Sequence, residues 1–149
     1  MSASHSIPTA IFDTNICLDF FVFHDPVSCQ LLEKVKKQKL YAVTRNDCRD
    51  EWLRVLDYPQ LAIEESVKKQ AIEDFDRFIH VVEPEKKDKH LLPVCTDKDD
   101  QKFLEIALDT NAQFLFSKDK AVLKLAKRNI KRGLFKILTP AYWLSHNNE

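Results

Sequence analysis

TAIFDTN, residues 9–15, places a short apolar run directly before three polar residues that suit a turn and a helix start. The run, from Thr9 to Phe12, has the character of a buried strand, and Asp13 would then lie at its carboxyl end. Open α/β sheets bind their ligands at that edge. The stretch therefore predicts a strand followed by a helix, with an acid at the functional edge of the sheet.

Strand-like and helix-like segments alternate along the rest of the chain. We expect further strands at 40–43, 80–82, 114–116 and 134–138, and helices at 16–23, 44–56, 62–79, 97–110 and 118–128. Another helix is expected between the first two strands, capped by Ser28 and ending in the basic run 34–39, while Thr44 would cap the helix at 44–56. Residues 83–96 lack periodicity and contain two prolines, which predicts a mobile loop.

No hairpin signal separates successive strands. The connections should therefore be helical crossovers, and the fold class should be α/β with a central parallel sheet flanked by helices on both faces. The 149 residues fit one domain, spanning 1–149.

Composition excludes several classes of protein. The only glycine, Gly133, rules out a P-loop and a glycine-rich dinucleotide fingerprint. Four widely spaced cysteines without a CxxC pair indicate neither a zinc site nor a disulfide framework, and we expect reduced thiols. No apolar run is long enough to cross a membrane, and MSASHSIPTA has no leader pattern, so a cytoplasmic location is expected. Because 23 basic residues balance 23 acidic ones, any polyanion would have to be held locally.

Glu51 lies on the helix expected at 44–56, whose apolar face is formed by Cys48, Trp52 and Val55. Glu51 falls at the edge of that face, so its carboxylate would be turned half inward. It could be a functional acid, or a carboxylate that is paired with arginine or extends to the surface. Helix geometry alone gives these alternatives even weight. For Asp13, helix capping is the ordinary alternative to a functional role.

Asp100 carries the strongest local signal. It precedes Phe103 by three residues and Leu104 by four, which places its carboxylate in the middle of an apolar stripe in the first turn of a helix. Asp97 and Asp99 already serve the helix dipole nearer the outside. We therefore expect Asp100 to be a functional acid and Asp97 and Asp99 to be caps.

Asp119 repeats the pattern of Asp13, because it follows the strand expected at 114–116 after Ser117 and Lys118. The carboxyl ends of parallel strands share one edge, so Asp13, Asp100 and Asp119 can converge, while Glu51 depends on how its helix packs. We expect no basic residue beside these acids to neutralise each of them. Four carboxylates would repel one another unless a hard divalent cation, Mg²⁺ or Mn²⁺, lies between them, as metal-assisted phosphodiester hydrolysis requires.

Three segments resemble a PIN-domain nuclease of the branch that contains toxin components of toxin–antitoxin systems, related to VapC-type ribonucleases. They are IFDTNICLDF, RNDCRDEWLRVL and CTDKDDQKFLEIALDTNAQFLFSKDKAVL, and the resemblance covers about residues 9–140. By position, the four family acids correspond to Asp13, Glu51, Asp100 and Asp119. Asn15 and Ser117 correspond to supporting polar positions, and Asp99 to an accompanying acid. SKD replaces the frequent TGD and brings Lys118 beside the site.

The resemblance implies a PIN fold and Mg²⁺- or Mn²⁺-dependent hydrolysis of single-stranded RNA, with the four acids holding one or two metal ions. It also implies an antitoxin protein as a partner. The aromatic residues Phe20, Phe21 and Phe23 would suit the core or a homodimer contact rather than base stacking, and such an apolar surface could also receive an antitoxin helix. Weaker candidates for phosphate contacts are Lys118, Lys120 and Arg45, with Lys86, Lys87 and Lys89 on the loop. For Lys118 an outward orientation is the first expectation.

Two other functions compete with the toxin. An RNA-processing nuclease without an antitoxin would carry the same site. A binding scaffold that keeps the fold without catalysis is a third hypothesis, against which the presence of all four acids counts.

Overall fold

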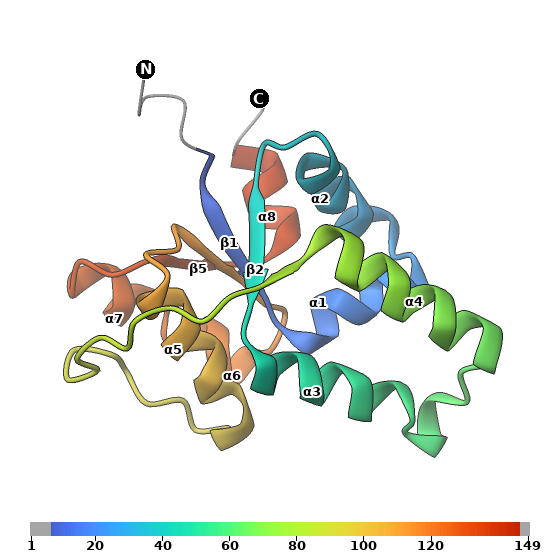
Figure 1. Ribbon diagram of the computed structural model, residues 1–149. Helices are drawn as coiled ribbons and strands as arrows, with labels where there is room; N and C mark the ends of the chain where they lie inside the picture. Colours follow the sequence, from blue (N-terminus) through green and yellow to red (C-terminus); the bar gives the residue numbers. More distant parts are fainter. Residues whose placement is uncertain (1–6, 147–149) are drawn as a thin grey trace.

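The computed structural model describes residues 7–146 and consists of a five-stranded parallel sheet with helices on both faces (Figure 1). The strands are β1 (Thr9–Phe12), β2 (Tyr41–Thr44), β3 (His80–Val81), β4 (Phe114–Phe116) and β5 (Lys136–Leu138). The α-helices are α1 (Thr14–Leu18), α2 (Pro26–Lys36), α3 (Asn46–Leu56), α4 (Glu65–Phe78), α5 (Gln101–Asp109), α6 (Lys120–Leu123), α7 (Ala126–Lys131) and α8 (Pro140–His146). A π-helix, η2 (Asp19–Phe23), continues α1, and the 3₁₀ turns η3 (Pro59–Leu61) and η4 (Lys98–Asp100) follow α3 and precede α5.

The strand order is β3-β2-β1-β4-β5, and every neighbouring pair is parallel. The predicted α/β class and parallel sheet are therefore confirmed. β1 is the central strand, with β2 and β3 on one side and β4 and β5 on the other. All strands end at the same edge, where α1, α3 and α6 begin shortly after β1, β2 and β4 (Figure 1).

Alternation along the strands divides the core into two clusters. Ala10 and Phe12 of β1 pack with α1, α2 and the aromatic residues of η2, whereas Ile11 between them packs with α5 and α6 on the other face. Leu115 and Phe116 of β4 divide in the same way. Both faces of the sheet are thus covered, which explains why the central strands β1 and β4 carry consecutive buried apolar residues rather than alternating with polar ones.

Two predicted helix caps are wrong. Asp25, not Ser28, caps α2, and its Oδ2 accepts the Ser28 backbone N–H at 2.9 Å. Ser28 is buried and donates its hydroxyl to Asp19. Thr44 is the last residue of β2, so α3 begins two residues later than expected, after Arg45, which makes no side-chain cap bond.

The carboxyl-terminal part of the chain also departs from expectation. Residues 118–128 were predicted to be one helix, but α6 ends at Leu123 and α7 begins at Ala126. The break lets Asn129 of α7 reach the sheet, where its Nδ2 donates to the Phe135 carbonyl at 2.8 Å. α8 was not predicted, and its Trp143 closes one face of the core against Phe114 and Phe116.

Residues 83–96 form neither helix nor strand, as expected for a loop. All four cysteines are free, which agrees with the prediction that no disulfide framework is present. Within residues 7–146 no helix combines the length and the apolar character that crossing a membrane requires. Residues 1–6, which are part of the stretch searched for a leader, and residues 147–149 lie outside the described residues.

Candidate metal centre

Asp13 leaves the end of β1 and caps α1. Its Oδ1 accepts the Ile16 backbone N–H at 3.1 Å, and its side chain is buried, with only 3% of the residue exposed. Its own N–H is bound by the Phe116 carbonyl of β4 at 3.3 Å, which fixes the acid against the neighbouring strand. The capping role weighed for Asp13 is therefore real, but it uses only one carboxylate oxygen and leaves the acid at the edge of the sheet.

Ser117 links Asp13 to Asp119 at the end of β4. Its hydroxyl, fully buried, hydrogen-bonds to the Asp13 carboxylate and accepts the Asp119 backbone N–H at 3.0 Å. The Asp119 Oδ1 atom in turn caps α6 by accepting the Ala121 N–H at 2.8 Å. The structure thus places Ser117 between two of the predicted acids.

Asp100 approaches the same edge from η4, immediately before α5. Its carboxylate and those of Asp97 and Asp119 each place an oxygen within 4.8 Å of the others. The Asp100 Oδ2 atom is buried and has no hydrogen-bond partner within residues 7–146. A buried acceptor without a donor is costly, so this atom requires either a proton or a cation.

Asp97 belongs to this cluster, although the sequence indicated only a capping role. It is a cap, since its Oδ1 accepts the Asp99 N–H at 3.0 Å. Capping and clustering coexist because η4 turns the chain so that Asp97 and Asp100 face Asp119. The run of acids in CTDKDD was the available signal, but it did not distinguish Asp97 from Asp99, which is likewise exposed and lies outside the cluster.

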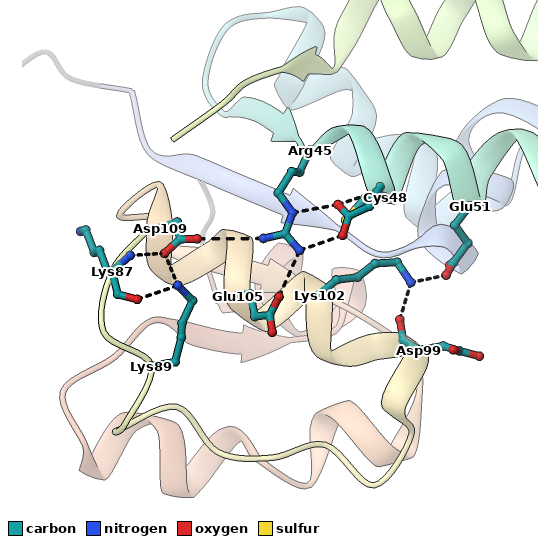
Figure 2. A network of polar contacts seen from close by, with 10 residues as sticks. Arg45, Cys48, Glu51, Lys87, Lys89, Asp99, Lys102, Glu105 and Asp109 are labelled. Carbon is teal, nitrogen blue, oxygen red and sulfur yellow. Dashed lines mark hydrogen bonds and ion pairs between the residues drawn. The ribbon is translucent and has the colours of Figure 1, made fainter. Parts of the chain in front are cut away.

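Glu51 is held beside the cluster rather than within it. Its Oε1 pairs with Lys102 of α5 (Figure 2), and its Oε2 accepts the Thr14 hydroxyl. Lys102 also donates to the Asp99 carbonyl. The expectation that no basic residue neutralises an individual acid is wrong for Glu51, because α3 and α5 pack with Glu51 facing Lys102. No pattern in the sequence indicated that Thr14 or Lys102 would contact Glu51.

The electrostatics of the acids reflect burial and crowding. Burial is the main cause that raises the pKa of Asp13 to about 6, with repulsion from Asp119 and Glu51 adding to it and the Ser117 hydrogen bond opposing it. The pKa of Asp100 is raised to about 8, mainly by burial. A hydrogen bond with Asp119 that favours the protonated acid and repulsion from Asp97, Asp119 and Asp13 raise it further. The site therefore favours protons or another cation.

These residues fit a hard divalent cation. The donors are carboxylate oxygens, which Mg²⁺ and Mn²⁺ prefer, and each cap occupies only the Oδ1 atom of Asp13, Asp97 or Asp119. The unpartnered Asp100 Oδ2 supplies a further acceptor. A cation held by these acids would place positive charge at the carboxyl edge of the sheet. Without it, the acids would repel a phosphate group.

Most of the basic candidates are already engaged. Arg45 pairs with Asp47 at 2.8 Å and with Glu105 at 3.1 Å, and approaches Asp109 at 4.0 Å (Figure 2). Lys118 pairs with Asp19, which leaves its side chain 46% exposed near the acids. Lys120 is exposed at the start of α6, and Asn15 is exposed in the first turn of α1.

Two loop residues are fixed by a buried acid that the sequence analysis did not single out. The Asp109 Oδ1 accepts the Lys87 backbone N–H at 2.8 Å and the Lys89 Nζ at 2.6 Å (Figure 2). Asp109 is the last residue of α5, a position at which an exposed acid would be ordinary, so no local pattern predicts its burial.

A family model described as the PIN domain matches residues 9–121. The match begins at β1 and ends just beyond Asp119, so it contains every acid described above. No curated protein and no solved structure matches the chain.

Proposed function

The chain belongs to the PIN-domain family, a family of nucleases, and from this premise we propose that it is a Mg²⁺- or Mn²⁺-dependent endoribonuclease acting on single-stranded RNA. The observation that carries the proposal is the cluster of Asp97, Asp100 and Asp119, in which the buried Asp100 Oδ2 has no hydrogen-bond partner within residues 7–146. Asp13 and Glu51 lie beside it, and both contribute negative charge to the same edge of the sheet.

The acids of the cluster would hold the ion, together with Asp13. A bound divalent cation would lower the pKa of a water molecule and stabilise negative charge on the phosphate. Ser117 keeps Asp13 oriented through its hydroxyl, and the capping bonds to Ile16 and Ala121 fix the directions of Asp13 and Asp119. The two backbone donors lie in the first turns of α1 and α6, and the third donor is a buried hydroxyl, so the acids are held without waiting for substrate.

Glu51 has a different part because it is already anchored by Thr14 and Lys102. In this arrangement Lys102 offsets one negative charge beside the cluster. A phosphodiester entering the site would meet the Lys102 ammonium, a group that binds phosphate as a point charge. Lys118, which remains 46% exposed beside Asp19, is a second cation on the approach to the acids.

The finer proposal is that the enzyme is the toxin component of a toxin–antitoxin system in the cytoplasm, inhibited by an antitoxin protein. The support is the similarity of its DTN, DEWLRVL, DKDDQKFLEIAL and SKD motifs to VapC-like nucleases. Single-stranded RNA as the substrate has the same support. A homodimer is also part of this proposal.

The test is cleavage of end-labelled single-stranded RNA by wild type, Asp13→Asn and Asp100→Asn in Mg²⁺, Mn²⁺ or EDTA. Products should form with either metal, disappear with EDTA, and fall by at least about a hundredfold in both variants, since each removes a carboxylate from the site. Single-stranded DNA of the same sequence measures the preference for RNA.

Asp50→Asn is the matched control, because Asp50 is an exposed acid on α3 beside Glu51 and outside the cluster. It should cleave like wild type. Equal trace cleavage in wild type, Asp13→Asn and Asp100→Asn would identify a contaminant and overturn the proposal in favour of a binding scaffold. Cleavage of DNA at the rate of RNA would leave a metal nuclease but refute the RNA assignment.

A further inference from the structure

The segment from α6 to α8 carries a net positive charge, which an excess of acidic residues in the rest of the chain offsets. Residues 120–146 contain no aspartate or glutamate, although the whole chain has 23 basic and 23 acidic residues. Seven cations lie in this segment: Lys120, Lys124, Lys127, Arg128, Lys131, Arg132 and Lys136. A neutral protein therefore presents one strongly basic region, which favours an acidic partner.

An apolar groove of about 760 Å³ lies within this region, at the open edge of the sheet. Its lining residues come from α6, α7, β5 and the start of α8. Its floor consists of aliphatic side chains from three elements: Leu123, Ala126, Ile130, Ile137 and Leu138. Ile130 is 49% exposed and Tyr142, at one end, is 56% exposed, so the groove has no cover within residues 7–146.

Lysines form the rim of the groove. Lys127 and Lys131 come from α7 and Lys136 from β5, and no acidic side chain of the described chain lines it. None of the three makes an ion pair with a residue between positions 7 and 146. The groove thus offers aliphatic contact below and unpaired positive charge around it.

A helix suits this groove better than an added strand. Lys136 donates its N–H to Gln113, and Leu138 accepts from Ser117, so these two residues face β4. On the side of β5 that faces away from β4, the Phe135 carbonyl already accepts a hydrogen bond from Asn129. Essentially only the backbone N–H and carbonyl of Ile137 then remain to pair with an added strand. A strand would gain few hydrogen bonds at so short an edge, whereas a helix satisfies its own backbone.

The floor also favours protein over nucleic acid. Bases stack on aromatic rings, but the floor is aliphatic, and the exposed Tyr142 ring is stacked on His146 at 4.0 Å between centroids. We propose that this groove binds an acidic amphipathic helix of a partner protein, with its apolar side on Ile130 and Ile137 and its carboxylates near Lys127, Lys131 and Lys136. The proposal does not depend on nuclease activity.

The probe is a short fluorescein-labelled peptide in which leucine and isoleucine recur at helical spacing and glutamate fills the flanking positions. Fluorescence anisotropy would measure its binding to the full chain, and a second peptide with lysine in place of glutamate would measure the charge requirement. The acidic peptide should bind, and the basic one should bind at least about tenfold more weakly.

Two variants test the two parts of the groove. Lys127→Glu should weaken binding of the acidic peptide by about three- to tenfold, since it reverses a rim charge. Ile130→Ser should weaken it by a similar factor because it removes apolar contact. The matched controls are Lys69→Glu on α4 and Tyr58→Ser, whose 47% exposure is close to that of Ile130; neither residue lines the groove. Thermal melts of all four variants would verify folding.

Two results would overturn the proposal. One is binding of the acidic peptide that neither Lys127→Glu nor Ile130→Ser reduces. The other is single-stranded RNA that displaces the peptide and whose own binding falls in Lys127→Glu but not in Ile130→Ser. This second result would assign the lysines to nucleic acid.

Discussion

Lys102 and Glu51 form an ion pair between α5 and α3 although 51 positions separate them in the sequence. Each side chain is only 17% exposed, so solvent screens the pair less than it would a surface pair. The pair places a fixed positive charge next to the carboxylates that would hold a divalent cation.

Removing this charge should strengthen metal binding. In Lys102→Met the cation would no longer face a neighbouring ammonium, and Glu51 would be released toward it. We expect the Kd for Mn²⁺ to fall by about tenfold, or ~1.4 kcal/mol, by isothermal titration calorimetry. Lys102→Arg should keep the wild-type affinity, and Lys69→Met controls for net charge. An unchanged or weaker affinity in Lys102→Met would show that the ion pair does not compete with the metal.

Asp100→Asn should stabilise the metal-free protein. The folded protein must either keep Asp100 protonated or hold a carboxylate that Asp97, Asp119 and Asp13 repel, whereas an amide at this position avoids both costs and can donate to Asp119. A gain of ~1 kcal/mol would raise Tm by about 3 °C for a chain of this size in EDTA.

The same variant should lose the stabilisation that Mn²⁺ gives to wild type, since binding to the folded state alone raises Tm. Asp50→Asn should follow wild type in both conditions. If Asp100→Asn melted below wild type in EDTA, the carboxylate would be satisfied in the folded protein by a contact that the cluster does not provide.

Metal binding should release a proton whose amount depends on pH. The pKa of Asp100 is raised to about 8 and that of Asp13 to about 6, so near pH 7 Asp100 is mostly protonated and Asp13 mostly ionised. A cation must displace the Asp100 proton, and affinity for Mn²⁺ should therefore rise as the pH increases from about 6 to 8 and then level off.

Calorimetric titrations in buffers of different ionisation enthalpy would count the proton directly. We expect a release close to one proton at pH 7 in wild type and much less in Asp100→Asn. Equal heats in all buffers at pH 7 would mean that Asp100 is already ionised before the metal binds.

The sign for stability follows from the same pKa values. An acid whose folded pKa of about 8 exceeds its unfolded value near 3.8 contributes fully to folding only below the unfolded value, and this contribution is lost as the pH rises from there through the folded pKa. Without metal, raising the pH from 5 to 8 should therefore destabilise wild type relative to Asp100→Asn, as chemical denaturation at each pH would measure. A difference between the two proteins that stays constant over this range would contradict the assigned shift.

The positions of the acids were easiest to predict from the sequence where an acid directly follows a strand. Asp13 and Asp119 follow apolar strands, and parallel strands end at one edge, so their convergence needed no tertiary information. The Glu51 pairing could not be predicted in this way, because it depends on how α3 packs on α5. The break between α6 and α7 was missed for a similar reason, because both segments have a helical sequence pattern. What accompanies the break is a tertiary contact, the hydrogen bond from Asn129 to the carbonyl of Phe135 just before β5.

Asp109 shows the same limit and leads to a prediction about the loop at 83–96. Its side chain is 1% exposed and accepts from Lys87 and Lys89 of the loop, with Arg45 at 4.0 Å supplying further positive charge. Asp109→Asn keeps the shape of the side chain but removes its negative charge, which faces the Lys87 N–H, the Lys89 ammonium and the Arg45 guanidinium. We expect a loss of about 2 kcal/mol in the free energy of unfolding by urea denaturation.

The loop should respond more than the sheet. Amide hydrogen exchange at 84–92 should accelerate by at least about tenfold in Asp109→Asn, while the amides of β1 and β4 change only as far as global stability falls. Glu105→Gln, which removes an outer partner of Arg45 and leaves Asp109 in place, should preserve protection of the loop. Unchanged exchange at 84–92 in Asp109→Asn would mean that the loop is held by its remaining contacts, among them the Arg132 bond to the Leu91 carbonyl at 2.9 Å, and that Asp109 serves α5 alone.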